Sequence, residues 1–223
     1  MKMFYILCEG QTEEEFIKAI LNPYLHSIGV YAKPIICETK RTPTRKFKGG
    51  VSSFSKVKKE LQKLCGEHKN ELVTTMFDLY AFPYDELELK NIPIDIYDKV
   101  SFIENAITTE VGTRFGNVIV NLVLHELEGL LFSDVSAFEN IAEQNAVAVL
   151  RGIRLAVPTP EHINESPETA PSKHIERAIP DFSKVADGID IAKQIGIDRI
   201  TSECRHFANW LDKLTAWAKE GEQ

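Results

Sequence analysis

Carboxylates follow three of the four apolar runs that the sequence marks as buried strands, at the point where each run ends. Glu9 follows the first run and Asp78 the third. Glu126 and Glu128 follow the fourth, within the segment HELEG. Because ligands of open parallel sheets bind outside the carboxyl ends of the strands, these side chains are expected at one edge. Clustered carboxylates repel one another unless a proton or a hard cation neutralises them, and Mg²⁺ (or Mn²⁺) is the natural cation.

The segment CEGQTEEEF (8–16) holds four glutamates, and helix stability explains two of them. Thr12 and Glu15 match the S/T-x-x-E capping box, and Glu14 has the spacing of a surface ion pair with a lysine four residues on. Glu13 continues the apolar stripe of the helix toward the sheet edge and is a candidate helper. Glu9 stands before the helix, on the exit of the strand, and is the best candidate metal ligand or general base.

Two groups of basic residues are candidates for binding phosphate. Lys173 stands at a helix start behind a proline, where a lysine and helix amides can cradle a phosphate, although Ser172 capping the helix explains the segment equally well. The other group lies in a Thr/Pro/Gly-rich loop, which can hold a nucleic-acid backbone or can be an ordinary solvated loop. The basic residues of this loop are Lys40, Arg41, Arg45, Lys46 and Lys48.

The order of the elements predicts an α/β fold. Runs at 3–8, 30–37, 72–77 and 118–124 predict four strands, and helical spacing at 13–25, 53–65 and 96–110 predicts helices between them. This β-α-β-α-β-α-β order indicates a mainly parallel four-stranded sheet with helices on both faces. Pro34 places the second strand near an edge, because proline cannot donate a ladder hydrogen bond.

The division of the chain is predicted to be a core at 1–135 and a helical region at 136–223 that packs on it as a single structural unit. An apolar stripe along 204–219 is expected to be core packing. The composition, 43% hydrophobic with a net charge of −7, is that of a soluble globular protein. No apolar stretch is long enough for a membrane span, no signal peptide is evident, and the four cysteines are far apart, so a cytoplasmic protein without membrane association is expected.

The same residues carry a resemblance to known proteins. The arrangement strand-Glu-Gly-x-Thr-Glu at the start, with an aspartate after the third strand, resembles the Toprim (Rossmann-like) fold of topoisomerases, primases and related nucleases. Five segments resemble the bacterial domain-of-unknown-function family 4276, a Toprim-like family often found beside ATPases in defence loci. In chain order they are CEGQTEEEF, TTMFDLYAFP, HELEGLLFSD, ETAPSKHIERAIPDFSKVADGIDIAKQIGIDRI and CRHFANWLDKL.

The resemblance implies roles for individual residues. Glu9 matches the Toprim glutamate, a general base or acid, and Asp78 matches the first acid of the Asp-x-Asp motif. Tyr80 stands where the second aspartate would be and is a candidate helper, so Glu126 or Glu128 would supply the missing carboxylate, with Glu126 favoured. His125 is a candidate helper, or a capping residue.

Two functions from different classes follow as expectations. The first is a Mg²⁺-dependent nuclease or phosphoesterase acting on DNA or RNA, tRNA included, as the effector of an anti-phage defence system with an ATPase partner. The second is a catalytically degenerate Toprim-like subunit that regulates or docks on the ATPase. A phosphoacceptor receiver domain is disfavoured, since the paired acids after the first strand and the lysine after a late strand are both lacking. Self-association into an oligomer is compatible with either function.

Overall fold

A parallel sheet forms the centre of the computed structural model, which describes residues 1–37, 51, 53–80, 82–163 and 168–220. The strand order is β2-β1-β3-β4, and β5 pairs with β3 beyond the end of β4. The strands are β1 (Lys2–Cys8), β2 (Val30–Ile36), β3 (Leu72–Asp78), β4 (Val118–Ile119) and β5 (Leu122–Val123). The predicted α/β class, with a mainly parallel sheet, flanking helices and a C-terminal helical region, is confirmed.

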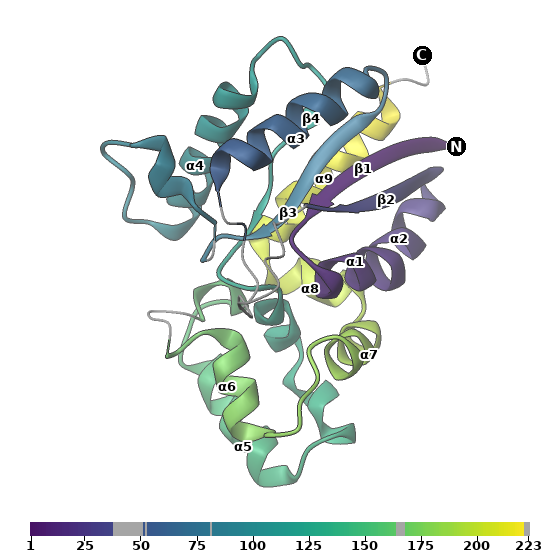
Figure 1. The fold of residues 1–223 in the computed structure, drawn as a ribbon. Helices are drawn as coiled ribbons and strands as arrows, with labels where there is room; N and C mark the ends of the chain where they lie inside the picture. The colour runs from purple at the N-terminus through teal and green to yellow at the C-terminus, as the bar shows by residue number, and fades with distance from the viewer. Residues whose placement is uncertain (38–50, 52, 81, 164–167, 221–223) are drawn as a thin grey trace, which may run out of the picture.

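Helices cover both faces of the sheet and extend beyond its carboxyl edge. In Figure 1, α3 and α4 lie on one side of the strands, α1, α2 and α9 lie on the other, and α5, α6 and α7 gather away from both termini. None of the described helices combines the length and apolarity that crossing a bilayer requires. The helical elements are α1 (Gln11–Phe16), η1 (Ile17–Leu21), α2 (Asn22–Ser27), α3 (Phe54–Glu67), η2 (Tyr84–Leu87), α4 (Ile96–Val111), η3 (Leu127–Ser133), η4 (Val135–Asn140), α5 (Gln144–Leu155), η5 (Pro160–His162), α6 (Pro171–Ala178), α7 (Ala186–Ile195), α8 (Ile197–Glu203) and α9 (Arg205–Lys219).

Alternation along the strands divides the interior into two cores. Phe4 and Ile6 of β1 face a core shared with α1, α2 and α7–α9, whereas Tyr5 and Leu7 face a core shared with α3 and α4. Successive side chains of a strand point to opposite faces, so a run that is apolar throughout is buried on both sides. The position of β2 at the edge, with Pro34 opposite Ile6, confirms the predicted edge strand.

The predicted strand at 118–124 is interrupted, which corrects the expected continuous run. Val118 and Ile119 pair with the start of β3, and Leu122 and Val123 pair with its end. At the break, the Thr75 hydroxyl accepts a hydrogen bond from the amide of Asn121 at 2.8 Å and donates to its carbonyl at 2.6 Å. At the break, the hydroxyl of Thr75 therefore takes the place of the backbone hydrogen bonds between the strands. The pattern of apolar residues in the sequence does not reveal such a replacement.

The predicted helix at 13–25 is also more irregular than expected. It consists of α1, the π-helical turn η1 and α2, and the amide of Asn22 donates to the carbonyl of Ile17. Pro23 has no N–H and cannot donate to a carbonyl one turn earlier. The wider π turn therefore lies just before the proline.

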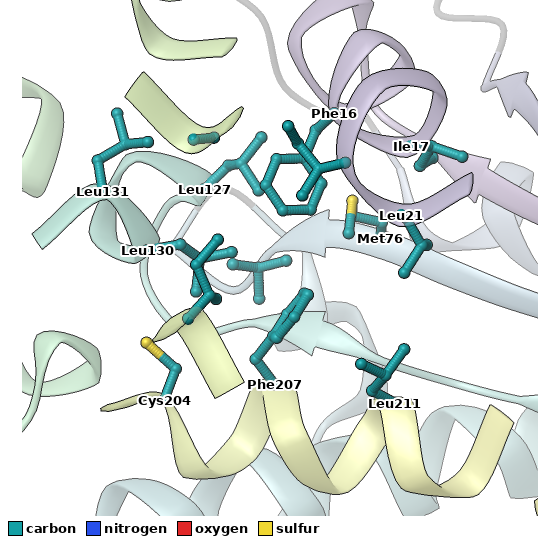
Figure 2. Close-up of a cluster of buried hydrophobic side chains, with 14 of the residues drawn as sticks. Phe16, Ile17, Leu21, Met76, Leu127, Leu130, Leu131, Cys204, Phe207 and Leu211 are labelled. Carbon is teal, nitrogen blue, oxygen red and sulfur yellow. The ribbon is translucent and has the colours of Figure 1, made fainter. Parts of the chain in front are cut away.

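The apolar stripe of α9 packs in the core, as predicted. Phe207, Trp210 and Leu214 are buried, and Phe207 meets Phe16 of α1 edge-on with ring centres 6.1 Å apart. Figure 2 shows side chains of α1 and α9 converging beside the leucines of η3. The Trp210 indole N–H also donates to the Thr74 hydroxyl of β3 at 2.9 Å, so the last helix is joined to the centre of the sheet. The predicted division of the chain into a core at 1–135 and a helical region at 136–223 stays a prediction.

A buried polar network joins β5, α4 and α9. Glu104 of α4 accepts a hydrogen bond from the amide of Leu122 at 2.8 Å and lies 2.9 Å from Nε2 of His206. Glu161 accepts from the first amides of α9, those of His206 and Phe207, at 3.0 Å each. Glu104 and His206 are both buried. If either side chain is removed, the polar groups that it bonded lose their hydrogen-bond partner, and water cannot reach them to take its place.

Replacing Glu104 with alanine is therefore expected to lower the free energy of unfolding by roughly 3–5 kcal/mol, the range for breaking a buried polar pair. Urea unfolding followed by circular dichroism measures this. Glu110→Ala is the matched control, because Glu110 lies on the same helix and pairs with Lys58 at the surface, where such pairs contribute about 0–1 kcal/mol. Equal losses in the two variants would contradict the structural role of the network.

Candidate functional site

The carboxyl edge of the sheet opens into a cleft of about 690 Å³. Glu9 follows β1, Asp78 ends β3, and Glu126 lies three residues past β5, so the strand-end acids meet there as the sequence predicted. Its lining residues are Glu9, Gly10, Gln11, Thr12, Glu13, Asp78, Tyr80, Glu126, Glu128, Glu168, Ala170, Ser172, Lys173, Glu176 and Lys184. Among these residues, seven carboxylates face two lysines.

Three of the carboxylates are held by backbone amides from different elements. Asp78 accepts from the amide of Leu127 at 3.0 Å, and Glu126 accepts from the amide of Ser172, in the first turn of α6, at 3.0 Å. Glu13 accepts from the amide of Gly10 at 2.8 Å. Each of these bonds uses one oxygen of its carboxylate.

Glu13 caps its own helix, which corrects the predicted capping box of Thr12 and Glu15. The helix begins two residues earlier than that box requires, with Gly10 at the N-cap in an extended conformation. The carboxylate of Glu13 therefore reaches back to the N-cap amide. Glu15 instead pairs with Lys18 at 2.9 Å, beside the predicted pair of Glu14 with Lys18 at 2.7 Å.

Buried leucines fix the segment that carries Glu126 and Glu128. Leu127, Leu130 and Leu131 of η3 pack into the core against α1 and α9, as Figure 2 shows. Burial of these leucines fixes the course of the backbone on either side of Glu128. Glu128, with a side chain only 5% exposed, therefore points into the protein at the base of the cleft and not toward solvent.

Burial and crowding of the acids in the cleft shift their protonation. Burial, followed by the charge of Glu13, raises the pKa of Glu9 to about 7. Burial, followed by the charges of Glu13 and Glu128, raises the pKa of Asp78 well above its usual range. Burial likewise raises the pKa values of Glu13 and Glu128. The ionised forms of these groups are therefore costly unless a cation compensates them.

Lys184 is a site residue that the sequence analysis missed. Its ammonium lies 2.9 Å from Oε1 of Glu128. Burial alone would lower the pKa of Lys184, but the charge and hydrogen bond of Glu128 outweigh burial and raise it, so the side chain stays cationic. Lys184 stands in a turn just before α7, about 175 residues after the first site carboxylate in sequence, and no local motif marks it.

The two predicted helpers beyond Glu13 differ in position. Tyr80 lines the cleft with 48% of its surface exposed. His125 is not among the residues that line it; its backbone is left-handed, with φ of +65°, and its Nε2 is buried without a hydrogen-bond partner in the described residues. Burial, followed by the charge of His162, lowers the pKa of His125 to about 4, so the ring is neutral at pH 7.

Of the predicted phosphate-binding residues, Lys173 lines the cleft, and its ammonium pairs with Glu176 at 2.5 Å. The neighbouring amide of Ser172 already donates to Glu126. The basic loop residues Lys40, Arg41, Arg45, Lys46 and Lys48 lie outside the residues that the structure describes, so their role stays a prediction.

The donor set of the cleft fits a hard divalent cation. Carboxylate oxygens are the ligands that Mg²⁺ prefers, and the cleft offers no described cysteine or histidine that would favour zinc. Within the described part of the chain, no three acidic, histidine or cysteine side chains already stand in a metal-binding arrangement. A cation would therefore have to draw carboxylate oxygens closer together than they lie in this structure.

Comparison with known families agrees with the segments quoted from the sequence. The model of the family described as domain of unknown function (DUF4276) matches residues 8–215. The chain belongs to the DUF4276 family. The match runs from the residue before Glu9 to the last turns of α9, so this DUF4276 protein shares the family pattern over both the sheet and the C-terminal helices. Neither curated proteins nor solved structures gave a significant match.

The raised pKa of Glu9 predicts how stability of the metal-free protein depends on pH. Because the folded value of about 7 exceeds the ordinary 4.5, the stability that protonation of Glu9 contributes is fully present below about pH 4.5 and is lost as pH rises through about 7. Glu9→Gln is expected to lose less stability than the wild type between pH 5 and pH 8. Thermal unfolding in EDTA measures the difference, with the surface variant Glu15→Gln as control. The same loss in all three proteins would contradict the shift.

Proposed function

We propose that the protein is a Mg²⁺- or Mn²⁺-dependent phosphodiesterase, a nuclease acting on DNA or RNA. The observation that supports this most strongly is the convergence of Glu9, Asp78, Glu126 and Glu128 on one cleft at the carboxyl edge of a parallel sheet. The resemblance to Toprim proteins, carried by the segments around Glu9 and Asp78, favours the same chemistry.

In this proposal Glu9 and Asp78 hold the cation together with Glu126 or Glu128. The geometry favours Glu126, since Glu128 is already paired with Lys184 and lies deeper. A bound divalent cation would supply stabilisation of negative charge on the scissile phosphate. The free oxygens of Asp78 and Glu126, opposite those bound by backbone amides, are the ones available to it.

Glu9 is also suited to proton transfer. Among the described residues it accepts no hydrogen bond comparable with those that hold Asp78 and Glu126, so its carboxylate is the least constrained of the group. In the metal-free cleft the pKa of Glu9 is about 7, and general acid–base catalysis uses a carboxyl group that can accept and return a proton near the operating pH.

The negative charge of the cleft affects the order in which the cation and the nucleic acid bind. A cleft with seven carboxylates and two lysines repels a polyanion until its charge is compensated, so we expect cation binding to precede nucleic-acid binding. Lys173 at the rim and the basic loop at 40–48 are the proposed contacts with the backbone. An anti-phage role with an ATPase partner, and tRNA as one possible substrate, rest on the family resemblance alone.

Glu9→Ala and Asp78→Asn are expected to reduce Mg²⁺-dependent cleavage of plasmid DNA or tRNA by about 10²–10⁴-fold, the range for loss of a catalytic acid or base. Asp78→Asn keeps an oxygen for the amide of Leu127, so its fold should persist. Glu15→Ala, which alters only a surface pair, should retain full activity. Cleavage at the wild-type rate by the Glu9 and Asp78 variants would contradict the proposal.

A second function, a catalytically degenerate regulatory or docking subunit of an ATPase complex, has its own support. Tyr80 occupies the position of a Toprim aspartate, and the carboxylates of the described cleft are engaged by amides and Lys184, not gathered for a metal. In that case the acidic cleft would receive a basic segment of the partner.

Calorimetry separates the two functions. The nuclease is expected to bind Mn²⁺ in a way that Asp78→Asn weakens by at least tenfold, and to bind more tightly at pH 8 than at pH 6 because ligation requires ionised carboxylates. A docking subunit should give no Asp78-dependent heat at either pH. Absence of Asp78-dependent heat would reject the metal centre and would not bear on the fold.

A further inference from the structure

Lys184 places a positive charge where the proposed function needs a metal ion. Its ammonium touches Oε1 of Glu128 at 2.9 Å, and both residues line the cleft with Glu9 and Asp78. Its side chain and that of Glu128 also line a small recess formed by apolar groups of Phe16, among others. Lys184 therefore lies beside apolar groups while its charged end reaches the acids, as long basic side chains commonly do.

No other described lysine of the cleft can perform this task. Lys173, the second one that lines it, is paired with Glu176 three residues along α6, and both side chains are about 40% exposed at the rim. Of the described residues that line the cleft, Lys184 is therefore the one whose positive charge compensates the inner carboxylates. The inner group has four members besides Glu128, namely Glu9, Glu13, Asp78 and Glu126.

The position of Lys184 allows it to leave. Its side chain is 40% exposed, whereas that of Glu128 is 5% exposed, so the lysine approaches from the solvent side of a fixed carboxylate. It stands in the turn before α7, and a four-carbon stem can rotate outward without movement of the backbone. A pair of this kind is an ion pair with one anchored and one movable partner.

We propose that Lys184 is an internal counter-ion that occupies the acidic cleft in the absence of metal and is displaced from Glu128 when a divalent cation binds. This inference rests on the proposed metal-dependent function and adds a competitor to it. The lysine and the cation compete for the same negative charge. Binding of one therefore weakens binding of the other by an equal factor.

The competition has two consequences of opposite sign. Removal of the lysine charge leaves the acids uncompensated, which destabilises the metal-free protein. It also removes the competitor, which strengthens cation binding by a factor expected in the range of about 5–150. A lysine that only positions Glu128 as a ligand would have the reverse effect on affinity, because its loss would weaken binding.

The test compares Lys184→Met with the wild type and with Lys193→Met. Lys193 lies on α7, pairs with Asp190 at 2.9 Å on an exposed surface and does not line the cleft, so its loss should change neither Mn²⁺ affinity nor the stabilisation by metal.

Titration calorimetry with Mn²⁺ gives the affinity, and thermal unfolding in EDTA and in Mn²⁺ gives the stabilisation by metal. Lys184→Met is expected to unfold at a lower temperature in EDTA, to gain more from Mn²⁺ and to bind it more tightly. Lys184→Gln, which keeps a hydrogen-bond donor without the charge, should behave alike and serves if the methionine variant fails to fold.

Equal or weaker Mn²⁺ binding by both Lys184 variants, with normal binding by the wild type, would overturn the counter-ion while leaving the metal site in place. Absence of Mn²⁺ binding in every protein would overturn the proposed metal-dependent function and this inference with it. Binding by the Lys184 variants alone would support the inference in its strongest form, in which the lysine excludes the cation.

Discussion

Repulsion among carboxylates is the constraint on which the rest of the site depends. The fold directs Glu9, Asp78 and Glu126 from separate strands to one edge and adds Glu13 and Glu128 from the neighbouring helical turns. On partly or fully buried side chains, that much negative charge is unfavourable unless something compensates it. Hydrogen bonds from backbone amides, protonation of some carboxyl groups and the ammonium of Lys184 together provide the compensation.

The same compensation ties the C-terminal helices to the sheet. The amide of Ser172 reaches Glu126 from the start of α6, and Lys184 reaches Glu128 from the turn before α7. Glu104 and His206 also join β5 to α4 and α9. The region after residue 135 therefore does more than cover an apolar face, because it supplies both a donor and the one described inner cation of the cleft.

Much of the fold could be predicted because burial leaves a periodic trace in the sequence. The apolar run of β1 indicated burial on both faces, Pro34 indicated an edge, and the spacing of Phe207 and Trp210 indicated a core-facing helix. The meeting of Glu9 and Asp78 followed from one topological rule, that parallel strands present their carboxyl ends at the same edge.

The remainder depends on contacts between residues far apart in sequence, which leave no such trace. The break in the fourth strand comes from Thr75 on its neighbour, and Lys184 meets Glu128 across a separation of 56 residues. The cap by Glu13 was missed for a different reason. A glycine can serve as N-cap without a side chain, so the Thr12 motif indicated a helix start that is two residues late.

Anomalous diffraction from crystals soaked in Mn²⁺ tests the central claim, that the strand-end carboxylates form a divalent-cation centre, most directly. The expected result is an anomalous peak within about 2.0–2.3 Å of oxygens of Glu9 and Asp78, with the ammonium of Lys184 moved away from Glu128. A cleft without an anomalous peak at saturating Mn²⁺, with Lys184 still on Glu128, would contradict it.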